Sequence, residues 1–76
     1  MAKAYLKVSV DTGKEREVCE ALKRVSGVKS ADLTTGDQDI IAIVEASNYE
    51  TLLKTIIVKM RQIEGISGTS TSLVLE

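Results

Sequence analysis

A group of polar residues in the middle of the chain has the types and spacing to hold a small charged ligand. Gly36, Asp37, Gln38 and Asp39 lie between two stretches of apolar sequence, and Asp39 directly precedes the run IIAIV. Backbone N–H groups beside a glycine can bind a carboxylate, and an aspartate can bind an ammonium group by a charge-assisted hydrogen bond. A hairpin turn is the alternative interpretation, because Asp and Gly are common in turns for conformational reasons.

A second group of polar side chains lies near the C-terminus, in the sequence GTSTS. Thr69 and Thr71 are two residues apart, so they share one face of a strand and can both hydrogen-bond a polar ligand. The alternative is an ordinary strand rich in β-favouring threonine. Tyr5 is a third candidate, because it lies on the polar face of the first predicted strand and can reach a pocket between subunits. The predicted ligand-binding residues are therefore Gly36, Asp37, Gln38, Asp39, Thr69, Thr71 and Tyr5.

The composition argues against catalysis and against a metal centre. The chain has no histidine, and Cys19 is its single cysteine. These residues exclude an internal disulfide and leave a zinc or iron–sulfur site without its ligands. A serine or cysteine nucleophile would lack its usual base, and no glycine loop has the spacing of a P-loop. We therefore predict no enzyme activity, no cofactor and no metal, and we interpret Cys19 as a small core residue.

Charge and apolar runs also exclude several partners. Ten basic and eleven acidic residues give a net charge of −1, and the two signs are interspersed. That pattern is not the basic footprint of a nucleic-acid-binding protein, and two tyrosines without Phe or Trp offer little for stacking bases. The sequence contains no signal region and no run long enough to span a membrane. With an unpaired thiol, a cytoplasmic location is expected.

Hydrophobic periodicity predicts four strands and two helices in one domain, residues 1–76. The segment 3–10 alternates as a strand with one buried face. Thr12 and Ser47 each precede a glutamate at capping-box spacing, so each is expected to cap a helix, and Gly27 and Gly65 are expected to end them. Residues 28–35 form a weaker edge strand, residues 40–44 are apolar on both faces, and residues 66–75 alternate as the last strand.

The order strand–helix–strand–strand–helix–strand predicts a ferredoxin-like α+β fold with both helices on one face of an antiparallel sheet. Strands one and three are then central, and the other sheet face is bare. Ile41 and Ile43, or their neighbours in the sequence, are expected there with Tyr5, Leu73 and Leu75, and a contiguous apolar patch marks an interface. Burial of ~600 Å² at ~25 cal/mol/Å² would yield ~15 kcal/mol before association costs. We therefore predict an isologous dimer through the sheets, a dimeric α+β barrel.

Three motifs resemble those of a known family: GV after the first helix, TGDQD before the third strand, and GI followed by Thr69-x-Thr71. They are similar to the ligand-sensing domain of the Lrp/AsnC regulators, also called the RAM domain (regulation of amino-acid metabolism). The family often has an aromatic residue where Gln38 stands. Because the chain begins at the first strand, it resembles a stand-alone form without the helix-turn-helix.

The resemblance implies dimers joined through their sheets, rings of four or five dimers (octamers or decamers), and amino-acid effectors between dimers. By motif match, the loop 36–39 with Thr69 and Thr71 would carry that site, and Asp39 would bind the amino group. The function expected is a non-enzymatic amino-acid sensor and oligomerisation module for transcription regulation, with full-length Lrp/AsnC regulators as further partners.

Other interpretations remain open from the residues. One is a structural or adaptor oligomer with an empty pocket. A second is an enzyme of the dimeric α+β barrel type, although such enzymes usually carry a histidine, a metal or a haem. A third is an ACT-type sensor, which usually has a glycine-rich turn after its first strand, where this chain has only Gly13.

Overall fold

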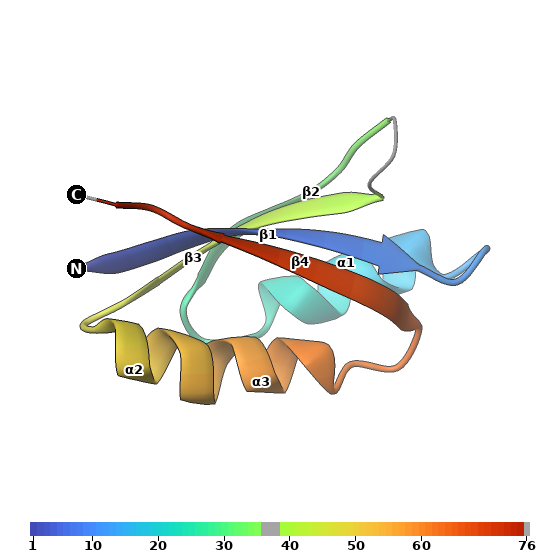
Figure 1. Ribbon diagram of the computed structural model, residues 1–76. Helices are drawn as coiled ribbons and strands as arrows, with labels where there is room; N and C mark the ends of the chain where they lie inside the picture. The colour runs from blue at the N-terminus through green and yellow to red at the C-terminus, as the bar shows by residue number, and fades with distance from the viewer. Residues whose placement is uncertain (36–38, 76) are drawn as a thin grey trace.

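A four-stranded antiparallel sheet covered on one face by helices forms the protein (Figure 1). The computed structural model describes residues 1–35 and 39–75, so the candidate residues Gly36, Asp37 and Gln38 lie outside the described residues. The strands are β1 (Ala2–Val10), β2 (Val28–Leu33), β3 (Ile40–Ala46) and β4 (Ile66–Leu73). The helical segments are α1 (Glu15–Lys23), α2 (Tyr49–Thr51), the π-helical η1 (Leu52–Ile56) and α3 (Ile57–Arg61).

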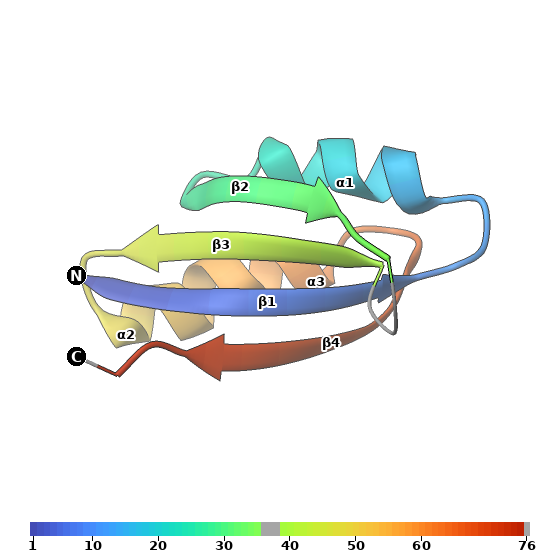
Figure 2. The same cartoon turned by 90° about the horizontal axis from the view of Figure 1, so that it is seen from above.

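The strand order is β2-β3-β1-β4, which confirms the predicted ferredoxin-like arrangement (Figure 2). β1 and β3 are central, and β2 lies at an edge as expected from its low apolar content. Both crossovers run beneath the sheet, so α1 and the α2–η1–α3 helix lie on the same side (Figure 1). The two chain ends lie at the same end of the sheet.

The core lies between the sheet and the helices. Every second side chain of the two central strands points into it and forms its sheet side. In β1, Leu6 and Val8 are fully buried, and in β3, Ile40 and Val44 are fully buried. Because successive side chains of a strand point to opposite faces, the residues between them point away from the helices. Val18, Leu22, Leu52 and Met60 complete the core from the helical side.

The start of α1 differs from the capping-box prediction. Lys14 occupies the N-cap position without a side-chain hydrogen bond, so Thr12 does not cap the helix. Glu15 instead accepts a hydrogen bond on Oε1 from the N–H of Gly13 at 3.1 Å. Gly13 has a φ of 90° and turns the chain, which leaves Thr12 too far from the first turn to serve as its cap.

The second helix is also capped by a different residue than predicted. Asn48, not Ser47, is the N-cap, and its Oδ1 accepts a hydrogen bond from the N–H of Thr51 at 2.7 Å. The π-helical η1 interrupts the α-helical repeat of this helix and shifts the helix face by an added residue. Leu53 and Tyr49, two apolar side chains of this helix, are 42% and 39% exposed.

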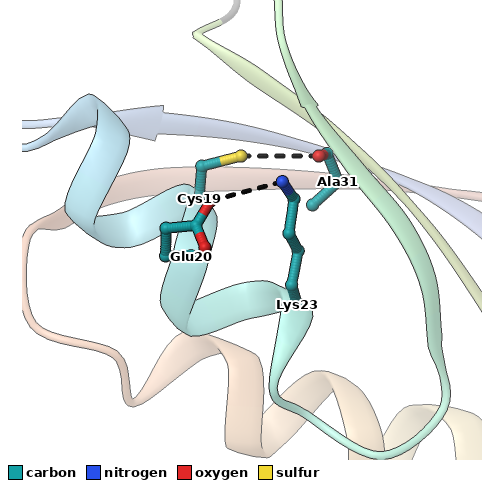
Figure 3. A network of polar contacts seen from close by, with 4 residues as sticks. All are labelled: Cys19, Glu20, Lys23 and Ala31. Carbon is teal, nitrogen blue, oxygen red and sulfur yellow. Dashed lines mark hydrogen bonds and ion pairs between the residues drawn. The ribbon is translucent and has the colours of Figure 1, made fainter.

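Cys19 is a core residue, as predicted. The side chain is 4% exposed, and its Sγ donates to the carbonyl oxygen of Ala31 in β2 at 3.4 Å (Figure 3). The neighbouring Lys23–Glu20 ion pair, at 3.3 Å, lies on the solvent side of α1. The thiol therefore connects the first helix to the edge strand.

Candidate functional site

The side chain of Asp39 accepts a hydrogen bond from the last residue of the central strand β1. Its Oδ2 accepts from the backbone N–H of Val10 at 2.9 Å, and its backbone oxygen accepts from the N–H of Thr34 at 3.0 Å. Between Ser9 and Val10 the register of β1 with β4 shifts, so the ladder is irregular where the carboxylate binds. A carboxylate at the edge of the apolar core is costly unless it is hydrogen-bonded. The protein itself thus satisfies one oxygen of this half-buried side chain.

Thr69 lies close to Asp39 in the sheet. Thr69 pairs with Val8 of β1, and Val8 pairs with Ile40, the residue that follows Asp39. The start of β3, the end of β1 and the start of β4 therefore meet at one end of the sheet. This end carries the described part of the predicted ligand-binding loop together with one of the two threonines.

Thr69 and Thr71 share a face, as predicted. They pair with Val8 and Leu6, which are both fully buried toward the helices, so the two threonines lie on the helix side of β4. Thr71 is nevertheless exposed and Thr69 half-buried, because β4 is an edge strand that the helices leave uncovered. Their hydroxyls are accessible to a ligand that approaches the sheet edge from this side.

Tyr5 lies on the opposite face of the sheet from the two threonines. It pairs with Ile43 of β3 and Ser72 of β4, is 39% exposed, and has Lys3 Nζ 5.7 Å from its ring centroid. Within one chain, Tyr5 and Thr71 therefore contribute to different surfaces. The structure brings Asp39 and Thr69 to one end of the sheet, and it does not bring Tyr5 into the same site.

The sheet surface that faces away from the helices is less apolar than the sequence suggests. We call it the open face, and its members are Lys3, Tyr5, Lys7, Ser9, Ser30, Asp32, Ile41, Ile43, Glu45, Gly68, Ser70 and Ser72. Tyr5, Ile41 and Ile43 are its large apolar side chains. Full burial of such a side chain is worth ~1.5–3 kcal/mol, so the three supply less than the ~15 kcal/mol anticipated from a wider patch.

The prediction that Leu73 and Leu75 join this surface is wrong. Leu73 pairs with the fully buried Ala4, so it lies on the helix side of β4 with 40% of its surface exposed. Leu75 follows the end of β4 and lines a hollow with Tyr49. The register with β1 decides which residues of β4 point toward the helices, and that register is a long-range property.

The hollow lies where the two chain ends meet the start of α2. It has a volume of about 600 Å³, and its lining consists of Met1, Ala2, Ser47, Asn48, Tyr49 and Leu75. The hydroxyl of Tyr49 donates to the carbonyl oxygen of Val74 at 2.8 Å, which fixes the ring beside the last strand. Sequence reasoning missed this hollow, because no local pattern shows that residues 1–2 and 75 lie together. None of the predicted site residues lines it.

In residues 1–35 and 39–75 no three His, Cys, Asp or Glu side chains come together as metal ligands. Over the same residues, no helix has both the length and the apolarity needed to cross a membrane.

Similarity to a known family covers almost the whole chain. The family model described as Lrp/AsnC ligand binding domain matches residues 3–76. An HTH-type transcriptional regulator of Pyrococcus horikoshii is 39% identical over 57 residues, which cover 75% of this chain and 38% of that protein. This chain thus spans well under two thirds of the length of such relatives.

Solved structures agree with the sequence matches. The hypothetical protein PHS023 from Pyrococcus horikoshii superposes with a TM-score of 0.90 at 34% identity, covering 100% of this chain and 92% of that one. A transcriptional regulator from Neisseria meningitidis, solved as a complex with L-Met, superposes with a TM-score of 0.73 at 21% identity. That match covers 99% of this chain and 50% of the other, and at this identity it shows the fold alone.

Proposed function

Because the chain belongs to the Lrp/AsnC ligand-binding domain family, we propose that it binds an amino acid and changes its assembly in response. The relatives are transcriptional regulators, so the module would serve transcription regulation, in the cytoplasm and without catalysis. The observation that carries the proposal is the half-buried carboxylate of Asp39 at the sheet end that also holds Thr69. A carboxylate so placed offers a charge-assisted hydrogen bond to an ammonium group.

Amino-acid chemistry suits the groups at this end of the sheet. Asp39 would bind the amino group of the ligand, and the hydroxyls of Thr69 and Thr71 would donate to its carboxylate or accept from its side chain. By the family motif, the loop residues Gly36, Asp37 and Gln38 would also belong to the proposed site. Support for an amino acid as the ligand class comes from the Neisseria meningitidis regulator of similar fold, which was solved as a complex with L-Met.

Assembly is the second part of the proposal. The open face leaves Tyr5, Ile41 and Ile43 partly in water, and a second copy of the chain would cover them, sheet against sheet. Rings of four or five such dimers would place the ligand between dimers, and full-length regulators of the family could join through the same surfaces. A ligand alters assembly only if it binds one assembly state more tightly than another. The interspersed charges argue against direct binding to nucleic acid.

One observation favours a second candidate, an adaptor oligomer without a ligand. The bond between Asp39 and the N–H of Val10 gives the carboxylate a structural task that needs no effector. Thermal-shift measurements with each of the twenty amino acids, combined with light scattering for mass, separate the two. Stabilisation by one or two amino acids supports sensing. A large mass with no stabilisation by any amino acid supports the adaptor and contradicts the proposal.

A further inference from the structure

Residues that pair across neighbouring strands form a row on the open face. In one such row, two residues of opposite charge flank an isoleucine. Lys7 pairs with Ile41 in the β1–β3 ladder, and Asp32 pairs with the same Ile41 in the β2–β3 ladder. Both charged residues are exposed, and neither forms an ion pair with any of the residues 1–35 and 39–75. They stand two strands apart, ~10 Å at the usual strand spacing, and both side chains project away from the same face of the sheet, parallel to each other and not toward each other.

Large and small side chains also divide the open face between its two halves. The β4 half carries Gly68, Ser70 and Ser72, whose side chains are small, whereas Ile41 and Ile43 project from β3. Another sheet can therefore approach most closely over β4. Ser70 belongs to the same row as Lys7, with which it pairs.

We propose that the open face binds a second copy of this chain with the two-fold axis parallel to β1 and β3, so that Lys7 pairs with the partner's Asp32. This inference rests on the proposed dimer and adds to it the orientation and the charges that select the partner. An axis along the strands keeps each row opposite the same row and places β4 over β2 of the partner subunit. The carboxylate of the partner's Asp32 then lies above Ser70, within reach of the long Lys7 side chain. Stacked sheets usually cross at ~30°, and the lysine side chain is long enough to span the resulting offset.

The other symmetric arrangement is disfavoured by the same charges. A two-fold axis across the strands at Tyr5 would reverse the rows and place Lys7 opposite the partner's Lys3. Like charges facing each other in an interface are strongly unfavourable. The order of charges along β1 and β2 therefore selects one of the two ways in which identical sheets can stack.

Two charge-reversal variants test the inference, Lys7→Glu and Asp32→Lys. Alone, each variant places like charges together twice in a symmetric dimer, so its self-association should weaken ~10-fold or more. Mixed in equal amounts, the two chains should form a heterodimer about as tight as the wild-type homodimer. The double variant, with both changes in one chain, restores both attractions and should self-associate like the wild type, which provides a test even where a single variant folds poorly.

Matched controls come from the helical side of the protein. Arg16→Glu and Glu50→Lys produce the same two net charges at exposed positions away from the open face. Those chains should self-associate like the wild type and mix at random. Native mass spectrometry of differently tagged chains measures the species, and the heterodimer preference of the sheet variants should fall as salt rises from about 0.1 to about 1 M.

Other outcomes overturn the inference. If Lys7→Glu dimerises as tightly as the wild type, the proposed pair is absent, and tighter dimers would indicate the axis across the strands. Random mixing of the two sheet variants would also contradict it. In both cases a dimeric wild type leaves the proposed function intact, whereas a folded monomeric wild type at micromolar concentration overturns the dimer and the charge pairing together.

Discussion

Asp39 and Val10, twenty-nine residues apart, are joined by a 2.9 Å hydrogen bond from the backbone N–H of Val10 to Oδ2 of Asp39. The bond satisfies a partly buried donor where the β1–β4 ladder becomes irregular. Asp39 therefore has one task that the fold requires and a second, ligand binding, that we propose. Substitutions can separate the two tasks.

Asp39→Asn and Asp39→Ala should differ in stability and agree in ligand binding. The asparagine retains an oxygen for the N–H of Val10, so the free energy of unfolding should change little. The alanine leaves that donor unsatisfied and should cost ~1–3 kcal/mol. Urea denaturation measures the difference. Both variants lack the charge, and calorimetry should show weaker amino-acid binding for both; unchanged affinity in Asp39→Asn would contradict the proposed contact with the amino group.

Thr71→Val should weaken amino-acid binding, while Thr71→Ser should retain it. Valine matches the shape of threonine but lacks the hydroxyl, and a typical hydrogen bond contributes ~0.5–1.5 kcal/mol, which is roughly a 2- to 13-fold change in Kd. Thr71 is exposed, so neither variant should unfold the domain. Equal affinities for the two variants would place the ligand elsewhere.

Gly27→Ala should destabilise the fold more than Gly13→Ala. Both glycines have positive φ values, 101° and 90°, so each substitution carries the backbone cost. A Cβ at Gly27 would also collide with Cδ1 of Ile56 in the π-helical segment, whereas a Cβ at Gly13 meets nothing within 4 Å. We expect a loss of ~1 kcal/mol at Gly13 and ~2–4 kcal/mol at Gly27 by thermal or urea unfolding.

A double variant isolates the collision. Ile56→Val removes Cδ1, so Gly27→Ala should cost less in that background than in the wild type. Additive effects of the two substitutions would show that the collision does not contribute.

Asn48→Ala should destabilise the protein by ~1 kcal/mol, because the second helix loses its N-cap bond to Thr51. Ser47→Ala is the matched control at the neighbouring exposed position and should stay within ~0.5 kcal/mol of the wild type. Chemical denaturation distinguishes them. A larger loss for Ser47→Ala would restore the capping box predicted from sequence.

These caps show which parts of the fold the sequence could predict. The alternation of β1 and the doubly apolar β3 are strong local patterns, and they placed both strands at the centre of the sheet. The second helix start offers two polar residues in succession, and the choice between Ser47 and Asn48 depends on backbone geometry that spacing does not reveal. The π-helical turn left no recognisable pattern in the sequence.

The candidate site was harder to predict, because it depends on which residues face which way. The register between β1 and β4 places Thr71 on the helix side and Tyr5 on the open face, so these two candidates separate. The same register removes Leu73 from the open face. Long-range pairing also supplied the N–H of Val10 to Asp39, a partner that the local sequence around the loop could not suggest.

Sedimentation velocity of the wild-type chain at low micromolar concentration tests the central claim, that a second copy covers the open face. The account predicts a dimer or a multiple of dimers, which Lys7→Glu shifts toward the single chain. A well-folded single chain of 8.2 kDa in the wild-type sample would contradict it.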